Sequence, residues 1–271
     1  MSIIKETKRK TTQTIRNMKV KGEKISVLTA YDFTMASILD EAGIDVILVG
    51  DSAANVMAGH ETTVPITLDQ MIYHASCVTR GCKQALVVVD LPFGTYQGDP
   101  YDAYKNAVRV MKETGAHAVK LEGGKEIEKA IQLITQAGIP VMGHLGLTPQ
   151  SIHQLGSFGI QAKGDSESQK LKEDALLLES LGCFSVVLEK IPSPLAKEVS
   201  EALKIPTIGI GGGPHCDGQV LVINDMLGMT KDFKPKFLRQ YLNLYDQILQ
   251  ASSLYIEDVK RGDFPNESEQ Y

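Results

Sequence analysis

Short, mainly apolar runs alternate with longer amphipathic stretches along most of this chain. Runs such as Val46–Val49, Leu86–Val89 and Ala118–Leu121 are bounded by glycine or by an acidic residue. Runs of this length, rich in β-branched and aliphatic residues, indicate strands that are buried on both faces, as in parallel sheets. The stretches between them, for example 68–78, carry apolar residues at three- and four-residue spacings, which predicts helices with one buried face.

One unit recurs: a strand, a loop, a helix, a glycine and the next strand. The segments EAGIDVILVGD, ETGAHAVKLEG, QAGIPVMGHLG and SLGCFSVVLEK each place a glycine where a left-handed helix cap is expected. Consecutive parallel strands joined by right-handed crossovers form either a closed barrel or an open doubly wound sheet. The segment TAYDFTMAS after the first strand lacks the glycines of a phosphate fingerprint, which favours the barrel. The expected strands are 25–29, 46–49, 86–89, 118–121, 141–143, 184–188, 207–210 and 220–222.

The predicted fold is therefore α/β, a (β/α)8 TIM barrel in a single domain spanning 1–271. Residues 1–24 form a leader segment with a helix that caps the bottom of the barrel. Residues 25–232 form the barrel, and residues 233–271 form C-terminal helices and a tail.

Composition narrows the class of protein. The 271 residues are 43% hydrophobic and 23% charged, which is ordinary for a globular protein, and the net charge is −5. Basic residues crowd only between Lys5 and Lys24, without interleaved aromatic residues, so we expect no nucleic-acid partner. No apolar run is long enough to span a membrane, and no apolar signal segment follows the basic stretch, so we expect a cytoplasmic protein. The four cysteines show no C-x-x-C spacing, which predicts free thiols.

Three acidic residues end three successive strands. Asp51, Asp90 and Glu122 would converge on the rim of the barrel where such folds carry their active sites. Carboxylate oxygens are the ligands that Mg²⁺ prefers. Each acid could instead cap the helix that follows its strand. Three acids at three strand ends favour the metal site.

Other polar residues lie at the same rim. Lys120 precedes Glu122 by two residues and shares its face of the strand, where it would bind an anionic substrate or neutralise the acids. Glu189 ends the sixth strand and is either a general base or an ion-pair partner. His144 ends the fifth strand and is either a substrate or base partner or a packing residue.

Long segments resemble one family, the ketopantoate (3-methyl-2-oxobutanoate) hydroxymethyltransferases, from about Leu28 to Asp225. The chain departs from the usual family pattern in the loop GSFGIQAKGD, where a stretch like GGYKVQGR is typical. The matching segments are LTAYDFTMA, ILVGDSAANVMAGHETTVPIT, YHASCVTRG, VVDLPFGTY, AVKLEGG, PVMGHLGLTPQS, VVLEKIP, IPTIGIGGG and DGQVLV.

The resemblance implies an activity and a cofactor. It implies hydroxymethyl transfer from 5,10-methylenetetrahydrofolate to 3-methyl-2-oxobutanoate through a Mg²⁺-stabilised enolate. The product would be 2-dehydropantoate, for pantothenate and coenzyme A biosynthesis. The assembly it implies is a homodecamer, a pentamer of dimers.

The resemblance also implies roles for individual residues. It implies Mg²⁺ ligation by Asp51, Asp90 and Glu122, and it makes Glu189 the proton acceptor. It implies that Asp51, Ser52, Asp90 and Lys120 bind the substrate. From its rim position, we expect His144 to bind the substrate as well.

Two other interpretations remain open from the residues alone. A carbon–carbon lyase or phosphonomutase of the phosphoenolpyruvate-binding barrels would use a similar rim, but without a pterin. A catalytically silent barrel that serves as a binding protein would not need the acids or Glu189.

Overall fold

The computed structural model describes residues 9–271 and contains a closed barrel of parallel strands. Each strand pairs with the next in sequence order, and β8 pairs with β1 to close the barrel. This confirms the predicted TIM barrel and rules out the open sheet. The strands are β1 (Ile25–Thr29), β2 (Val46–Val49), β3 (Leu86–Asp90), β4 (Ala118–Glu122), β5 (Val141–Gly146), β6 (Ser185–Glu189), β7 (Thr207–Ile210) and β8 (Gly218–Leu221).

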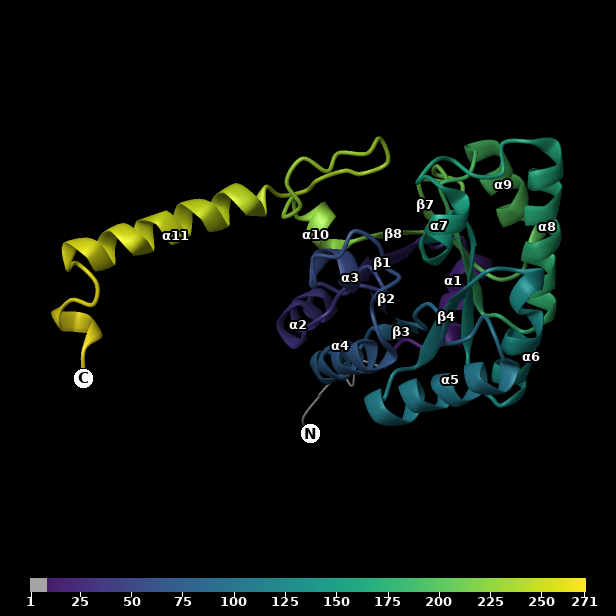
Figure 1. The fold of residues 1–271 in the computed structure, drawn as a ribbon, viewed down its shortest axis with the longest axis horizontal. Helices are drawn as coiled ribbons and strands as arrows, with labels where there is room; N and C mark the ends of the chain where they lie inside the picture. The colour runs from purple at the N-terminus through teal and green to yellow at the C-terminus, as the bar shows by residue number, and fades with distance from the viewer. Residues whose placement is uncertain (1–8) are drawn as a thin grey trace. The chain divides into compact units, whose positions relative to one another are not determined.

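Helices cover the outside of the strands (Figure 1). The apolar stripe predicted for 68–78 is buried, and Thr67 caps that helix reciprocally with Gln70. The four glycines predicted to cap helices have φ between 72° and 89°. The helices around the barrel are α2 (Phe33–Glu41), α3 (Ala53–Val56), α4 (Leu68–Gly81), α5 (Pro100–Thr114), η1 (Lys125–Ile127), α6 (Glu128–Gln136), η2 (Pro149–Ser151), α7 (Ile152–Leu155), α8 (Asp165–Ser180) and α9 (Ser193–Ala202).

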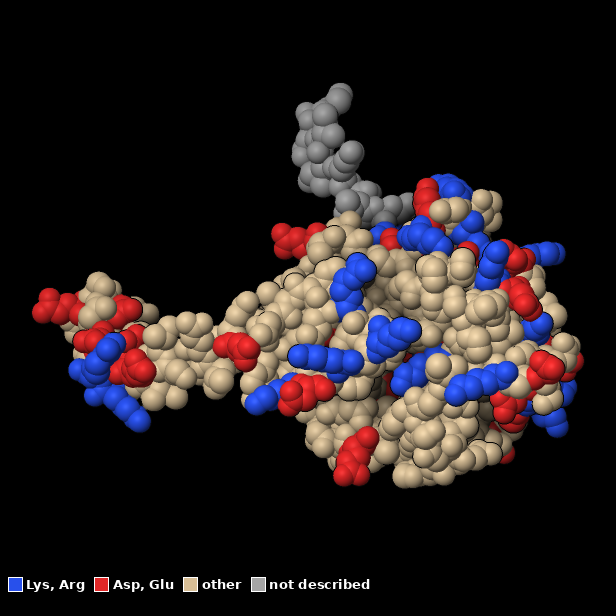
Figure 2. Space-filling view, turned by 90° about the horizontal axis from the view of Figure 1, so that it is seen from above, with Lys and Arg blue, Asp and Glu red and all other residues tan. Residues whose placement is uncertain are grey.

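The chain forms two compact units, which divide after Val222. The second unit contains α10 (Ile223–Met226), α11 (Leu244–Arg261) and η3 (Glu267–Glu269). Within residues 9–271, no helix combines the length and the apolar content needed to cross a bilayer. Figure 2 shows both basic and acidic side chains across the visible face of the first unit.

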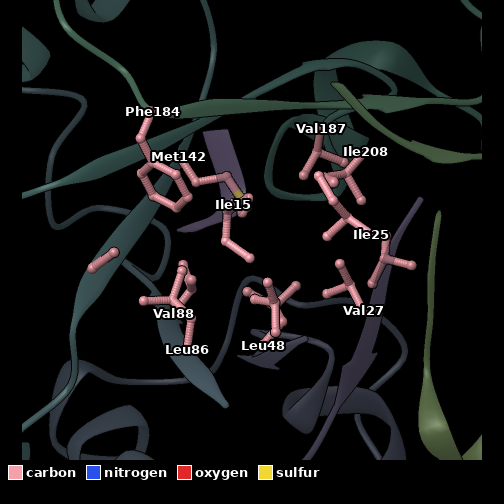
Figure 3. Packing of buried hydrophobic residues seen from close by; sticks show 13 residues of the cluster. Ile15, Ile25, Val27, Leu48, Leu86, Val88, Met142, Phe184, Val187 and Ile208 are labelled. Carbon is pink, nitrogen blue, oxygen red and sulfur yellow. The ribbon is translucent and has the colours of Figure 1, made fainter. Parts of the chain in front are cut away.

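The leader helix α1 (Thr12–Lys21) supplies a plug for the barrel. Ile15 is fully buried and belongs to the same apolar cluster as interior residues of the strands, such as Leu48, Val88 and Met142. In Figure 3 the labelled strand residues surround Ile15. The expectation that the leader helix caps the barrel bottom is thus confirmed.

Basic side chains of the leader are anchored to other segments of the barrel. Arg9 donates to the carbonyl of Cys82 at 2.9 Å, and Lys10 forms an ion pair with Asp45 at 2.7 Å. Lys19 donates to the carbonyl of Ser200 at 2.7 Å. These contacts lie before β3, before β2 and before β7, so the leader ties together segments that enter the barrel at different points.

We predict that Ile15→Ala destabilises the protein by about 2–5 kcal/mol, because truncation of a fully buried isoleucine removes packing and leaves a cavity. Urea unfolding followed by circular dichroism measures the change. The matched control is Val20→Ala on the same helix, where the side chain is 82% exposed and the change is expected to stay within about 0.5 kcal/mol. Equal losses of unfolding free energy in the two variants would contradict the conclusion that Ile15 closes the bottom of the barrel.

Candidate active site

The barrel interior changes from apolar to charged along each central strand. On β3, Leu86 and Val88 belong to the apolar cluster, and Asp90 follows two residues later. On β4, Ala118 belongs to that cluster and is followed at the same spacing by Lys120 and then Glu122. Because side chains alternate along a strand, these polar residues continue the interior-facing rows. They therefore occupy the carboxyl-terminal end of the barrel, as predicted.

Strand register brings acids and bases together in pairs. Asp90 on β3 is the direct partner of Lys120 on β4, and Glu122 on β4 is the partner of His144 on β5. The Lys120 ammonium lies 2.5 Å from Asp90 Oδ1, and both side chains are buried. The backbone N–H of Asp51 donates to Asp90 Oδ2 at 3.0 Å. Asp51, Asp90 and Lys120 thus form one connected group.

His144 lies between two carboxylates. Its Nδ1 is 3.2 Å from Glu122 Oε1, and its Nε2 is 3.3 Å from Glu189 Oε2. These contacts are short but are not aligned as hydrogen bonds. Glu122 Oε1 and both ring nitrogens are therefore buried without a hydrogen-bond partner. Burial and Lys120 lower the pKa of His144, but Glu122 and Glu189 outweigh them and raise it to about 9. At neutral pH the ring is therefore an imidazolium that faces both acids.

Crowding of negative charge dominates the electrostatics at Asp51. Burial, together with the charges of Asp90 and Glu122, raises the pKa of Asp51 to about 8. Burial alone would lower the pKa of Lys120, but Asp90 and Glu122 reverse this and raise it. The pKa of Glu122 is lowered, because contact with His144 and the charge of Lys120 outweigh burial. The site thus holds more carboxylates than its own cations neutralise.

The residues at the end of β2 pack closely beside the acids. Ser52 Oγ lies 2.8 Å from the hydroxyl of Tyr31. A Cβ on Gly50 would lie 2.7 Å from Ser52 Oγ and 3.7 Å from Asp90 Oδ2, so any larger residue would crowd the site. Glycine at position 50 therefore allows Ser52 and Asp90 to approach the backbone closely.

None of the three acids caps the helix that follows it. The N-cap of α3 is Ser52, and that of α5 is Asp99, whose side chain accepts from the N–H of Tyr101. The N-cap of η1 is Gly124. The helix-cap alternative is thus wrong for Asp51, Asp90 and Glu122, and their burial has no such explanation.

The structure brings the predicted residues into one neighbourhood and adds two that sequence reasoning missed. Gln150 and Tyr96 are both buried and hydrogen-bonded to each other at 2.8 Å. They lie in the loops after β5 and β3, within the segments LTPQS and FGTYQ. Their position just after strand ends was the available signal, but a neutral side chain in a loop does not by itself indicate chemistry. The predicted residues that meet here are Asp51, Ser52, Asp90, Lys120, Glu122, His144 and Glu189.

The donor set fits a hard cation without being a preformed chelate. Among residues 9–271, no group of three or more His, Cys, Asp or Glu side chains is placed to hold a metal ion as it stands. Magnesium, however, is commonly bound through one or two carboxylates, with water and substrate oxygens completing its shell. Glu122 Oε1 is a buried oxygen without a hydrogen-bond partner, and the pKa of Asp51 is raised by the neighbouring carboxylates. A divalent cation would relieve both conditions.

Comparison with known proteins identifies relatives of the whole chain. The family described as ketopantoate hydroxymethyltransferase matches residues 9–267. A 3-methyl-2-oxobutanoate hydroxymethyltransferase of Flavobacterium johnsoniae is 65% identical over 267 residues, covering 98% of each chain. The enzyme of the same name from Parabacteroides distasonis is 59% identical and covers 100% of both chains.

Solved structures share the fold at low identity. A phosphonopyruvate hydrolase in complex with oxalate and Mg²⁺ superposes with a TM-score of 0.62 at 10% identity, covering 96% of this chain and 93% of that one. A 2,3-dimethylmalate lyase of the PEP mutase/isocitrate lyase superfamily gives a TM-score of 0.59 at 16% identity, covering 94% of this chain and 89% of that one. At such identities the likeness shows a shared barrel fold.

We predict that the metal-free protein loses thermal stability as pH rises from about 6.5 to about 8, above the range in which the lowered pKa of His117 acts in the opposite direction. A group with a raised pKa in the folded state holds a proton that the unfolded chain releases, so stability falls between its two pKa values. This window extends from 3.8 to about 8 for Asp51 and from 6.5 to about 9 for His144. The window of Glu122 lies below 4.5 and does not interfere.

Differential scanning fluorimetry in the presence of a chelator measures this decline. Asp51→Asn removes one of the two groups and should make the Tm fall less steeply with pH. A Tm that rises over the same interval in the native protein would contradict the charge crowding.

Proposed function

The chain belongs to the ketopantoate hydroxymethyltransferase family, and we propose that it transfers a hydroxymethyl group from 5,10-methylenetetrahydrofolate to 3-methyl-2-oxobutanoate, forming 2-dehydropantoate. Its relatives at 59–65% identity over nearly the full chain are enzymes of this name. The observation that carries the proposal is the buried group of Asp51, Asp90 and Glu122 around one lysine at the catalytic rim of the barrel.

The charges of the site support binding of a 2-keto acid. Asp51 and Asp90, with Glu122, would hold Mg²⁺, which when bound supplies Lewis-acid polarisation of the keto oxygen. Lys120 offers a buried positive charge toward the substrate carboxylate while remaining paired with Asp90. Ser52, which packs against Gly50 next to the acids, would add a hydroxyl.

Glu189 would accept the proton from C3 of the keto acid. Its side chain is 15% exposed, whereas those of Asp90 and Glu122 are 2% and 3% exposed, so it reaches toward the opening of the barrel. The His144 imidazolium lies beside it, with Nε2 3.3 Å from Glu189 Oε2. The electron pair left at C3 would then form the new bond to the methylene carbon, the carbon–nitrogen bonds that join this carbon to tetrahydrofolate would break, and one water would supply the hydroxyl group of the product.

The wider setting is also part of the proposal. The reaction would serve pantothenate and coenzyme A biosynthesis in the cytoplasm, in a homodecamer built as a pentamer of dimers. Helix α11 supports self-association, because it has no buried residue. Its exposed apolar side chains include Ile248, Leu249, Leu254, Tyr255 and Ile256.

A turnover assay with single omissions tests the activity. We expect formation of 2-dehydropantoate only when 3-methyl-2-oxobutanoate, methylenetetrahydrofolate and a divalent cation are all present. Carbon–carbon cleavage or phosphorus–carbon rearrangement without folate would favour the lyase or phosphonomutase alternative. Metal binding without any turnover would favour a silent barrel.

Glu189→Gln should abolish exchange of the C3 proton while leaving metal-dependent keto-acid binding within about threefold, because the amide keeps the shape but cannot accept the proton. Proton NMR in D₂O follows the exchange, and calorimetry measures binding. Exchange at the native rate in this variant would exclude Glu189 as the base.

A further inference from the structure

Gln150 makes contact with two of the proposed metal-binding acids at once. It lies in η2 immediately after β5 and is only 4% exposed. Its side-chain Nε2 donates to Asp51 Oδ2 at 2.8 Å, and its backbone N–H donates to Glu122 Oε2 at 3.0 Å. These acids come from different strands, so one residue connects the β2 and β4 sides of the rim.

The orientation of the Gln150 amide is determined by its surroundings. Nε2 also donates to the carbonyl of Leu91 at 3.0 Å, and a carbonyl can only accept. Oε1 accepts from the Tyr96 hydroxyl at 2.8 Å and from Gln97 Nε2 at 3.0 Å. Both amide protons and both oxygen lone pairs are therefore used, which leaves a single arrangement in which the nitrogen faces Asp51.

Tyr96 secures the opposite end of the amide. Its hydroxyl accepts from the backbone N–H of Glu122 at 3.0 Å and donates to Gln150 Oε1 at 2.8 Å, a shorter distance than the 3.3 Å to the Glu122 carbonyl. The ring is buried, with 2% exposure. The amide oxygen of Gln150 is thus held by the Tyr96 hydroxyl, which is itself hydrogen-bonded to β4.

From these contacts we propose that Gln150 is a positioning residue that holds the Asp51 and Glu122 carboxylates ready for the divalent cation. It engages one oxygen of each acid and leaves the other oxygen of each carboxylate for the cation. At Glu122 that other oxygen is Oε1, the buried atom that lies 3.2 Å from His144 Nδ1 and has no hydrogen-bond partner. The inference rests on the proposed metal-dependent function.

The experiment measures the Kd of Mn²⁺ alone, by electron paramagnetic resonance of the free ion, because carboxylate sites also accept Mn²⁺. Gln150→Met keeps the length of the side chain but cannot donate a hydrogen bond, and we expect about ten- to hundredfold weaker binding. Gln150→Glu keeps an acceptor for Tyr96 but places an oxygen against Asp51 Oδ2 and the Leu91 carbonyl, so its binding should be at least as weak.

The control is Gln161→Met, the same change at a rim glutamine whose amide donates to the carbonyl of Gly159. Its Kd should stay within about twofold of the native value. Thermal melts identify variants that do not fold, and a purely structural glutamine would lower the Tm without changing the Kd of the folded protein. If Gln150→Met does not fold, Tyr96→Phe decides, with a smaller but measurable loss expected.

Native affinity in folded Gln150→Met or Gln150→Glu would overturn the inference while leaving the proposed function intact. The same holds for native affinity in Tyr96→Phe when Gln150→Met does not fold. Failure of the native protein to bind Mn²⁺ would instead overturn the metal-dependent function itself. The two failures are therefore distinguishable in one titration series.

Discussion

The dominant constraint at the rim is the electrostatic repulsion among carboxylates that are buried in one small volume. Asp51, Asp90 and Glu122 are each at most 6% exposed, and a single lysine lies among them. Like charges removed from water raise one another's pKa, which is seen most clearly at Asp51. Such an arrangement is unfavourable for a protein that only needs to fold, and strained charge of this kind is typical of functional sites.

The barrel makes this arrangement possible because the residues that stabilise the fold and the charged residues lie at opposite ends of the strands. The lower part of the interior is filled by aliphatic side chains around Ile15, with the leader anchored beneath by Arg9, Lys10 and Lys19. The rim can then carry unfavourable charge, because the packing below it holds the strands in register. Register in turn sets the pairs Asp90 with Lys120 and Glu122 with His144.

The polar contacts of the site form a continuous path from one acid to the next. Asp51 connects to Asp90 through its backbone and to Glu122 through Gln150, and Glu122 approaches His144, which approaches Glu189. The proposed base and the proposed metal-binding acids are thus linked through one imidazolium. A change in the charge at one end of this path alters the electrostatic field at the other end.

The sequence by itself determined the repeating strand–helix order, the buried stripe of α4, the glycine caps and the placement of the acids at strand ends. These are local properties, since periodicity and chain position alone decide where a side chain points along a strand. Only the tertiary structure decided that His144 lies between Glu122 and Glu189, that basic leader residues are anchored, and that Gln150 orients Asp51. The last contact joins residues 99 positions apart, and no local pattern specifies which neutral side chain closes such a distance.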